Sequence, residues 1–296
     1  MPKIIGIDVA GYQSESLVRY VNAGAKYVII KATEGNWYFN PIAVEQIKSA
    51  HAHHIYVHAY HYAEFSNSVS KAKQEAKYFL ARCKTLGISK KRWLWLDWES
   101  GSGNYVYGDK SANTRAILAF METCSAAGYH VGLYAGASIL RNNVDTSKII
   151  HKFGNCLWVA SYVTIGRIDN PNFNYFPSMD GVAIWQFTED WRGLKVDGNV
   201  MLIDLHAEKK TSQQVKPKSA VKPIEKIPKT VFIPIIDNNP NYKVRLLSSE
   251  GHYQDQYILT NSNWKVWGVK IIKGMKCYKI GTEKQYVPAK FTKIIE

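Results

Sequence analysis

The sequence predicts an α/β barrel over residues 1–205, followed by a small all-β domain. Through the first two thirds of the chain, apolar runs typical of strands alternate with stretches of helical periodicity. Repeated strand–helix units build a parallel sheet. Eight strands in so short a stretch suit a small closed barrel better than an open sheet. The helical signal fades after about residue 155, so we expect the last strands to lack full helices between them.

The predicted strands are short runs rich in β-branched and aromatic residues. They are Lys3–Val9, Tyr27–Lys31, Ile55–Tyr62, Arg92–Glu99, Val131–Ala135, Leu157–Ser161 and Val182–Phe187, with an eighth near Asn199–Ile203. Helices are expected where apolar residues recur at spacings of three and four. They are Pro41–His53, Val69–Leu86, Ala112–Ala127 and Asp145–Lys152.

A change of composition separates the two predicted domains. Residues 206–230 hold seven Lys, three Pro and no aromatic residue, so they bury too little apolar surface to fold alone. We interpret them as a linker. Residues 231–296 combine turn clusters with short β-branched and aromatic runs, which indicates a small all-β domain. Its size favours a binding module over a second enzyme.

The charge is concentrated towards the C-terminus. The chain has a formal net charge of +14, and residues 206–296 hold 17 Lys and Arg against 7 Asp and Glu. A basic surface predicts an anionic partner, either nucleic acid or the anionic polymers of a cell wall. No nucleic-acid-binding motif is present, which favours the wall. No apolar run is long enough to span a membrane.

Other residue classes predict neither a cofactor nor a metal. The four cysteines lack CxxC spacing and are expected to be free buried thiols rather than zinc ligands or disulfides. His51, His53 and His54 could bind a metal, but solvated histidines at a helix end fit the pattern better. The start of the chain lacks the pattern of a signal peptide, so we expect synthesis in the cytoplasm.

The stretch WLWLDWES carries the strongest chemical signal. Asp97 and Glu99 follow a very apolar strand, and alternate strand residues point to one face about 7 Å apart. Two such carboxylates resist ionising together, and Trp95 and Trp98 lower the local polarity, so one pKa is expected to rise. A carboxyl group with a raised pKa can protonate a glycosidic oxygen. The alternative is a polar strand end that carries helix caps or ion pairs.

Further polar residues gather at the ends of other predicted strands, where barrel enzymes form their sites. Asp8 ends the first strand, Glu34 follows the second, and Asp197 and Asp204 lie near the last. Additional side chains expected either in the site or in the core are His58, His61, Tyr62, Tyr134, Trp185 and Trp37.

Seven stretches in a fixed order resemble glycoside hydrolase family 25, the Chalaropsis-type lysozymes found in many phage endolysins. They are GIDVAGYQ, IIKATEG, YHYA, LWLDWES, GLYAG, LWVASY and AIWQF, over about residues 3–204. The resemblance implies an irregular (β/α)5(β)3 TIM-like barrel. It also implies cleavage of the β-1,4 bond between N-acetylmuramic acid and N-acetylglucosamine in peptidoglycan.

The same resemblance implies roles for individual residues. Glu99 would be the general acid/base, Asp97 would stabilise positive charge or orient the substrate's 2-acetamido group, and Asp8 would line the cleft. The family's motif GNVDLN reads GNVMLID here, with Met201 at the expected acid, so Asp197 or Asp204 would replace it. The expected substrate-binding residues are Asp197, Glu34, His61, Tyr62, Tyr134 and Trp185. Since no separate nucleophile stands out, substrate-assisted catalysis is favoured over an enzyme nucleophile.

The C-terminal stretch KGMKCYKIGTEKQYVPAKFTKI resembles the C-terminal domain of Lactobacillus surface-layer proteins, which is related to SH3-like wall-binding modules. This resemblance implies binding to anionic wall polymers such as teichoic acids. Together the two resemblances describe a lysozyme with a wall-targeting domain, and the missing signal peptide favours a phage enzyme that reaches the wall after a holin opens the membrane. The alternatives are a bacterial autolysin, a wall-binding protein without activity and a chitinase-like enzyme. The oligomeric state is left open.

Overall fold

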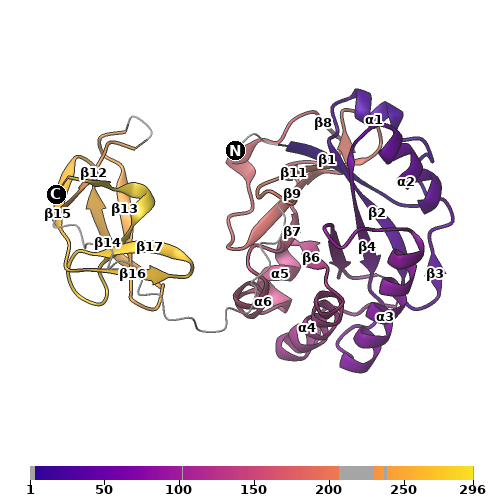
Figure 1. Cartoon of the computed structure of the whole chain (residues 1–296), viewed down its shortest axis with the longest axis horizontal. Coiled ribbons are helices and arrows are strands. Elements are labelled where there is room, and N and C mark those ends of the chain that lie inside the picture. Colours follow the sequence, from indigo (N-terminus) through magenta and orange to yellow (C-terminus); the bar gives the residue numbers. More distant parts are fainter. Residues whose placement is uncertain (1–3, 102, 207–229, 237–238, 296) are drawn as a thin grey trace, which may run out of the picture. The chain divides into compact units, whose positions relative to one another are not determined.

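A computed structural model describes residues 4–101, 103–206, 230–236 and 239–295 (Figure 1). The chain divides into two compact units, Met1–Thr211 and Ser212–Glu296, and each has a hydrophobic core of its own. Residues 207–229 of the expected linker lie outside the described residues. His206, which we assigned to the linker, instead stacks on Tyr56 of the first unit, with ring centroids 3.6 Å apart.

The first unit is built on a closed barrel of eight strands, as expected. In chain order they are β1 (Ile4–Val9), β2 (Tyr27–Glu34), β4 (Tyr56–Tyr62), β5 (Trp93–Asp97), β6 (His130–Gly136), β7 (Leu157–Ala160), β9 (Val182–Thr188) and β11 (Asp197–Met201). Each strand pairs with the next in this order, and β1 closes the ring by pairing with both β2 and β11. The two-residue strand β3 (Tyr38–Phe39) extends the sheet beside β2, and β8 (Arg167–Ile168) pairs with β10 (Asp190–Trp191).

The last barrel strand runs against the others. β11 is antiparallel to both of its neighbours, β1 and β9, whereas the other barrel pairs are parallel. Its register sets Asp197 opposite Asp8 and Met201 opposite Ile4. The first residue of β11 therefore lies at the end of the barrel where the parallel strands finish.

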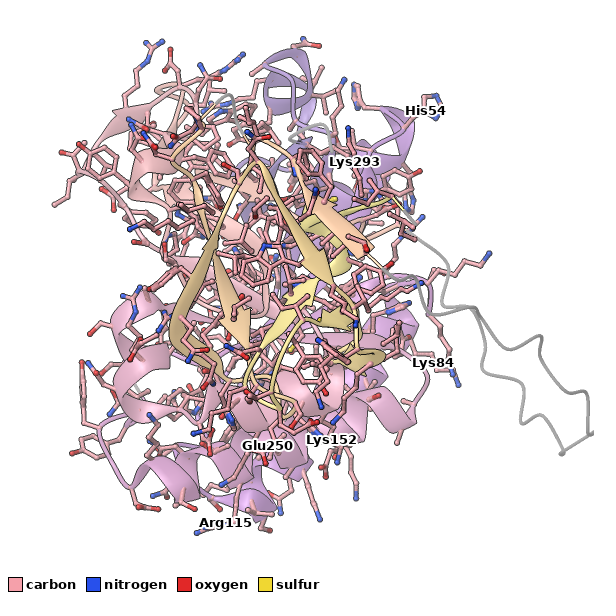
Figure 2. The ribbon with its side chains drawn as sticks, turned by 90° about the vertical axis from the view of Figure 1, so that its left-hand side faces the viewer. His54, Lys84, Arg115, Lys152, Glu250 and Lys293 are labelled. Carbon is pink, nitrogen blue, oxygen red and sulfur yellow. The ribbon has the colours of Figure 1, made fainter. Side chains whose placement is uncertain are left out.

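Helices cover the outside of the barrel (Figure 1). They are α1 (Val18–Asn22), α2 (Ala43–Ala52), α3 (Val69–Thr85), α4 (Lys110–Ala126), α5 (Ala137–Asn143) and α6 (Thr146–Phe153). The sequence did not predict α1 and α5, because five and seven residues are too few to show a helical period. Exposed charged residues cover the outer faces, as Lys84, Arg115 and Lys152 show in Figure 2.

Large aromatic side chains fill the barrel, and small residues make room for them. Trp95 and Trp158 are fully buried, with ring centroids 5.8 Å apart. A Cβ atom at Gly132 would lie only 2.1 Å from the Trp95 ring, so this position excludes a side chain. The interior is a packed core, and polar chemistry is confined to the ends of the strands.

The second unit contains two antiparallel sheets. Its strands are β12 (Thr230–Ile233), β13 (Lys243–Leu247), β14 (Tyr253–Leu259), β15 (Ser262–Lys265), β16 (Gly268–Ile272), β17 (Met275–Lys279), β18 (Tyr286–Pro288) and β19 (Lys293–Ile294). One sheet has the order β14-β13-β18-β17-β16 and the other β15-β12-β19. Among the described residues of both units, no helix is long and apolar enough to cross a membrane, and all four cysteines are free and buried.

Candidate active site

Four carboxyl groups meet at the end of the barrel where the parallel strands finish. Asp8 lies near the end of β1, Asp97 is the last residue of β5, and Glu99 follows two residues later. The reversed strand β11 brings Asp197 to the same end. The structure therefore brings together all three expected catalytic residues and one of the two acids proposed to replace Met201.

Asp8 and Asp197 form a hydrogen-bonded carboxyl pair. The Oδ2 atom of Asp8 also accepts hydrogen bonds from Gln186 Nε2 at 2.9 Å and Asn199 Nδ2 at 2.7 Å. Burial raises the pKa of Asp8, while these amide donors oppose the rise. Burial and the charge of Asp8 raise the pKa of Asp197 to about 10. Burial and mutual repulsion therefore favour a pair that keeps one proton, and the two amide donors to Asp8 favour its placement on Asp197.

A second layer of hydrogen bonds fixes both amides. Gln186 Oε1 accepts from the hydroxyl groups of Tyr134 at 2.9 Å and Tyr162 at 2.5 Å. Asn199 Oδ1 accepts from Trp158 Nε1 at 2.7 Å. With their oxygens engaged, both amides must present NH2 to Asp8. Of this network the sequence analysis named only Tyr134. The alternation of β9 and β11 could have placed Gln186 and Asn199 inside the barrel, but it does not identify their partners.

Asp97 and Glu99 have different surroundings. Asp97 is buried, and burial followed by the charge of Glu99 raises its pKa well above the usual value. Glu99 is partly exposed, and burial followed by the charge of Asp8 raises its pKa. Lys31 opposes both shifts. The site therefore combines a partly exposed carboxyl group of raised pKa with a more deeply buried one.

Lys31 is the cation of the site, and the sequence analysis did not single it out. Its Nζ atom bonds to Glu34 Oε2 at 2.5 Å and lies 4.7 Å from the centre of the Tyr62 ring. Glu34 therefore affects the acids indirectly, because its ion pair fixes the position of Lys31. Tyr62 is partly exposed beside the acids, and its hydroxyl group would lie 1.9 Å from a Cβ atom at Gly101. Glycine at 101 allows the loop after β5 to pass this close to Tyr62.

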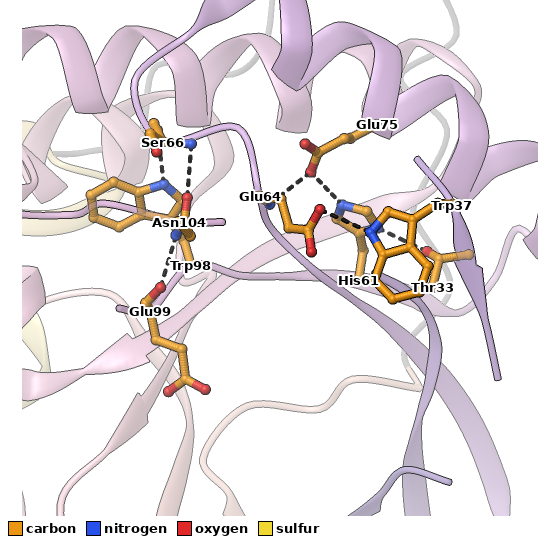
Figure 3. Close-up of polar contacts among 9 residues, drawn as sticks. All are labelled: Thr33, Trp37, His61, Glu64, Ser66, Glu75, Trp98, Glu99 and Asn104. Atoms are coloured by element: carbon orange, nitrogen blue, oxygen red, sulfur yellow. Dashed lines mark hydrogen bonds and ion pairs between the residues drawn. The ribbon is translucent and has the colours of Figure 1, made fainter. Parts of the chain in front are cut away.

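A hydrogen bond from the Asn104 side chain fixes the main chain at Glu99. Asn104 Nδ2 donates to the carbonyl oxygen of Glu99 at 2.8 Å, and its Oδ1 accepts from the backbone N–H of Ser66, also at 2.8 Å. The Trp98 indole donates to the carbonyl oxygen of Ser66 at 3.1 Å. Figure 3 shows the Glu99 carboxyl group pointing away from Asn104. The strand ends at Asp97, two residues before the predicted end, so these contacts rather than the sheet set the position of Glu99.

Tyr60 is a site residue that the sequence analysis missed. It is buried on β4, and burial raises its pKa, with further contributions from the charges of Asp8, Asp97, Asp197 and Glu99. Its hydroxyl group therefore lies within the field of all four acids. The motif YHYA drew attention to His61 and Tyr62, but a residue two positions before Tyr62 shares its face of the strand.

The expected contact between His61 and the substrate is not supported. His61 is fully buried on the opposite face of β4, where its Nδ1 atom lies 2.8 Å from Thr33 Oγ1 and its Nε2 atom 2.9 Å from Glu75 Oε2 (Figure 3). Its ring packs against Phe79 and Phe120 under the helices. The residue joins the barrel to the helical layer and does not reach the acids.

Trp185 is also placed away from the site. Because Gln186 points inward to Asp8, its neighbour on the strand points outward. The Trp185 indole is buried against Phe173, Phe176 and Phe187 and donates to the carbonyl oxygen of Ser161 at 2.9 Å. Tyr134, by contrast, contacts the site through Gln186.

The position of the fourth acid follows from strand direction. Met201 lies opposite Ile4, at the far end of the barrel from the other acids, so an acid at 201 could not reach them. Asp204 is exposed, and its Oδ1 atom accepts from the backbone N–H of His206. Only Asp197 joins the group. The match of the motif GNVDLN to GNVMLID had placed the expected acid at position 201, which is four residues after Asp197.

A metal site is not formed by the described residues, because no three His, Cys, Asp or Glu side chains among them are grouped suitably for an ion. The hydrogen bonds and pKa shifts instead describe carboxyl chemistry. A partly exposed acid of raised pKa can supply a proton, and buried carboxylates can stabilise developing positive charge. This combination suits the cleavage of a glycosidic bond.

Comparisons with known proteins identify the family and the fold. The family model for glycosyl hydrolases family 25 matches residues 7–195. A lysozyme of Lactococcus phage mv1 is 46% identical over 181 residues, which are 61% of this chain and 90% of that protein. A lysozyme of Streptococcus phage Cp-1 is 32% identical over 216 residues, which are 72% of this chain but only 56% of that protein.

Structural similarity extends to a crystal structure of the modular Cpl-1 endolysin complexed with a peptidoglycan analogue. It covers 96% of this chain and 70% of that one, with a TM-score of 0.58 and 24% identity, and it supports the fold alone. The family match covers more than half of the chain. The chain therefore belongs to glycosyl hydrolases family 25.

Proposed function

We propose that Glu99 is the general acid/base with which this phage-type lysozyme hydrolyses the β-1,4 bond between N-acetylmuramic acid and N-acetylglucosamine in peptidoglycan. The observation that carries this assignment is the raised pKa of a partly exposed carboxyl group above a buried acid. Among the four grouped acids, Asp8 and Asp97 are buried, and the carboxyl group of Asp197 is engaged by Asp8. Glu99 is therefore the group best placed to reach a glycosidic oxygen.

In the proposed reaction, Glu99 donates its proton to the leaving oxygen as the bond breaks. Positive charge then develops on the sugar ring, and the negative charge of the Asp8–Asp197 pair stabilises it. Asp97 is the more buried of the two acids, and the charge of Glu99 adds to the effect of burial in raising its proton affinity. Both amide donors engage Asp8, which makes it a poor nucleophile. We therefore propose that the substrate's own acetamido oxygen attacks the anomeric carbon, and that Glu99 later activates water.

Replacing the proton donor tests the assignment. We expect Glu99→Gln to reduce the rate of wall lysis, measured as loss of turbidity, by about 10²–10⁴-fold. The matched control is Glu122→Gln, which removes an exposed carboxylate on α4 that pairs with Lys152. It should lyse walls at the original rate. Near-normal lysis by Glu99→Gln would contradict the assignment.

The products identify the bond that is cut. Mass spectrometry of digested peptidoglycan should find new reducing ends on muramic acid. Reducing ends on glucosamine would indicate a glucosaminidase, and freed peptides would indicate a peptidase or amidase. A protein that binds walls without releasing fragments would be the non-catalytic alternative.

We also propose that the second unit is an SH3-like module that binds an anionic wall polymer. Residues 231–296 hold ten Lys and Arg against five Asp and Glu, which supports attraction to a polyanion. Wall binding in a pelleting assay should therefore weaken as salt is added. We further propose that the protein is made in the host cytoplasm and reaches the wall after release through a holin. The same barrel would serve a bacterial autolysin equally well.

A further inference from the structure

An exposed indole ring and a carboxylate lie together beside the acids of the site. Trp37 is 64% exposed, and its Nε1 atom donates to Glu64 Oε2 at 3.0 Å (Figure 3). Trp37 lies three residues after the end of β2, and Glu64 lies two residues after the end of β4. This Trp37–Glu64 pair therefore belongs to the end of the barrel where enzymes of this architecture bind their substrates.

The neighbours of the pair fix the position of the carboxylate. Gly35 and Gly103 have φ angles of 50° and 82°, and both lie directly against the Glu64 side chain. A Cβ atom at Gly35 would lie 2.3 Å from Glu64 Oε2, and one at Gly103 would lie 2.9 Å from Glu64 Cγ. The Trp37 carbonyl oxygen accepts from the Tyr78 hydroxyl group on α3 at 3.2 Å. A side chain held in this way loses little conformational entropy when it binds a ligand.

The charge of Glu64 is not neutralised within the protein. In the part of the chain that the structure describes, no Lys, Arg or His forms an ion pair with it, and Lys31 on the neighbouring strand is paired with Glu34 at 2.5 Å. The indole N–H is already bonded to Glu64, so the ring offers its apolar faces to a ligand. A carboxylate beside an open aromatic ring favours an alkyl ammonium, whose charge pairs with the carboxylate and whose methylenes cover the ring.

A substrate held at Glu99 can reach this pair. Glu64 packs against Gly103, which lies only four residues after Glu99 in the same loop, and four residues span at most about 14 Å. Burial raises the pKa of Tyr62, and the charges of both Glu99 and Glu64 add to the rise, so Tyr62 lies near both carboxyl groups. An extended peptide of four residues covers the same distance of about 14 Å.

We propose that the Trp37–Glu64 pair binds the side-chain ammonium group of a diamino acid, such as lysine, in the peptide stem of peptidoglycan. The inference rests on the proposed hydrolysis of peptidoglycan and adds recognition of the peptide to recognition of the sugars. It also predicts a preference among wall strands. A stem whose side-chain amine is free carries the positive charge, whereas an amine that has been converted to an amide by a cross-link does not.

The decisive variant is Glu64→Gln. The glutamine oxygen can still accept from the Trp37 indole, so the substitution removes the charge and keeps the geometry. It also spares the proton donor, because burial and the charges of Asp8 and Lys31 are what shift the pKa of Glu99. Any effect of this variant therefore reports on a cation in the substrate.

The test measures kcat and KM of the full chain on three soluble substrates. They are glycan strands whose stems carry free amines, the same strands after N-acetylation of the amines, and strands stripped of peptide. On the first substrate we expect Glu64→Gln to lower kcat/KM about two- to fivefold, through KM alone, because the lost contact is remote from the bond that breaks. Trp37→Ala should act in the same direction. The matched control, Glu122→Gln, removes an exposed carboxylate on α4 and should behave like the parent.

The other two substrates decide between a peptide site and a sugar site. On acetylated and on peptide-free strands, the difference between Glu64→Gln and the parent should disappear. Equal losses on all three substrates would indicate a contact with the glycan and overturn the peptide site. A parent that cleaves free-amine and acetylated strands equally well would overturn it too, while the hydrolase assignment stands. A parent that cleaves none of the three substrates would overturn the proposed function itself.

Discussion

At the scale of single residues, the site depends on where protons reside. Asp8 accepts two amide hydrogen bonds and a third from Asp197, whose pKa is raised to about 10. In the unfolded chain both side chains would ionise near pH 4. Folding therefore takes up a proton at neutral pH, and the free energy of unfolding falls as pH rises between these two values. The resulting carboxyl pair carries one negative charge rather than two.

Asp197→Asn should remove the contribution of Asp197 to this dependence on pH, while the raised pKa values of Asp97 and Glu99 keep a weaker slope of the same sign. The wild type is expected to lose up to about 1.4 kcal/mol of unfolding free energy per pH unit from this proton between about pH 4 and 10. The asparagine amide can still donate to Asp8 but takes up no proton. Urea unfolding at pH 5, 6, 7 and 8 should thus show a flatter profile for the variant. Parallel profiles for the two proteins would contradict a protonated Asp197.

Residue types and spacing alone identified Asp8, Asp97 and Glu99 as an acidic group. They did not identify Lys31, Tyr60, Gln186 or Asn199, whose roles come from neighbours far away in the chain. His61 and Trp185, which the sequence left open between the site and the core, lie in the core because each is the strand neighbour of a residue that faces the acids. In a strand, the neighbouring residue points to the opposite side.

At the scale of elements, the loop between β5 and α4 sets the position of Glu99. Because β5 ends at Asp97, the sheet does not hold Glu99. Asn104 holds it instead by donating to the Glu99 carbonyl oxygen, and Asn104 is itself anchored by the backbone N–H of Ser66. Asn104 is buried, so loss of either bond leaves an unsatisfied backbone group. It acts on catalysis through Glu99 and is a positioning residue.

Asn104→Ala should lower kcat about tenfold with little change in KM, because a small displacement of the acid weakens proton transfer more than substrate binding. The stability cost should be about 1–3 kcal/mol. The control is Asn142→Ala on α5, where an exposed amide donates only to Ser138. Steady-state kinetics on a soluble glycan and thermal unfolding measure the two effects. A change in KM alone would show that Asn104 contributes to binding instead.

Most elements could be predicted because their signals are local. Apolar runs identified the eight strands, and residue spacing identified the four longest helices within a few positions. The direction of β11 could not be predicted, since an isolated five-residue run reads the same in a parallel or antiparallel sheet. The start of α4 was also set too late. Asp109 caps this helix by accepting from the backbone N–H of Ala112, and the expected helix began at Ala112 itself.

At the scale of the whole molecule, two separate cores imply two folding units. The core of the first unit lies within the barrel and under its helices, and the core of the second includes Val231, Ile233 and Val244. Each buries its own apolar side chains, so each is expected to unfold as a cooperative transition. Composition alone predicted this division, because a lysine- and proline-rich stretch separates the alternating strand and helix signals of the barrel from the short strand signals of the second unit.

Calorimetry of the full chain should therefore show two transitions. Ile233→Val removes one buried methylene in the second unit and should cost about 0.5–1.5 kcal/mol. For a domain of this size, each kcal/mol lowers Tm by about 4–8 °C. Ile184→Val makes the matched change in the barrel and should move only the other transition. A single transition that both variants lower would contradict independent units.

The pairing of β1 with β11 has a consequence for biosynthesis. Asp8 is translated almost two hundred residues before Asp197, its partner on the neighbouring strand. Until then the ring stays open, and the amides of Gln186 and Asn199 that orient Asp8 are missing as well. A chain that stops before β11 therefore lacks both the closed barrel and the complete carboxyl group cluster.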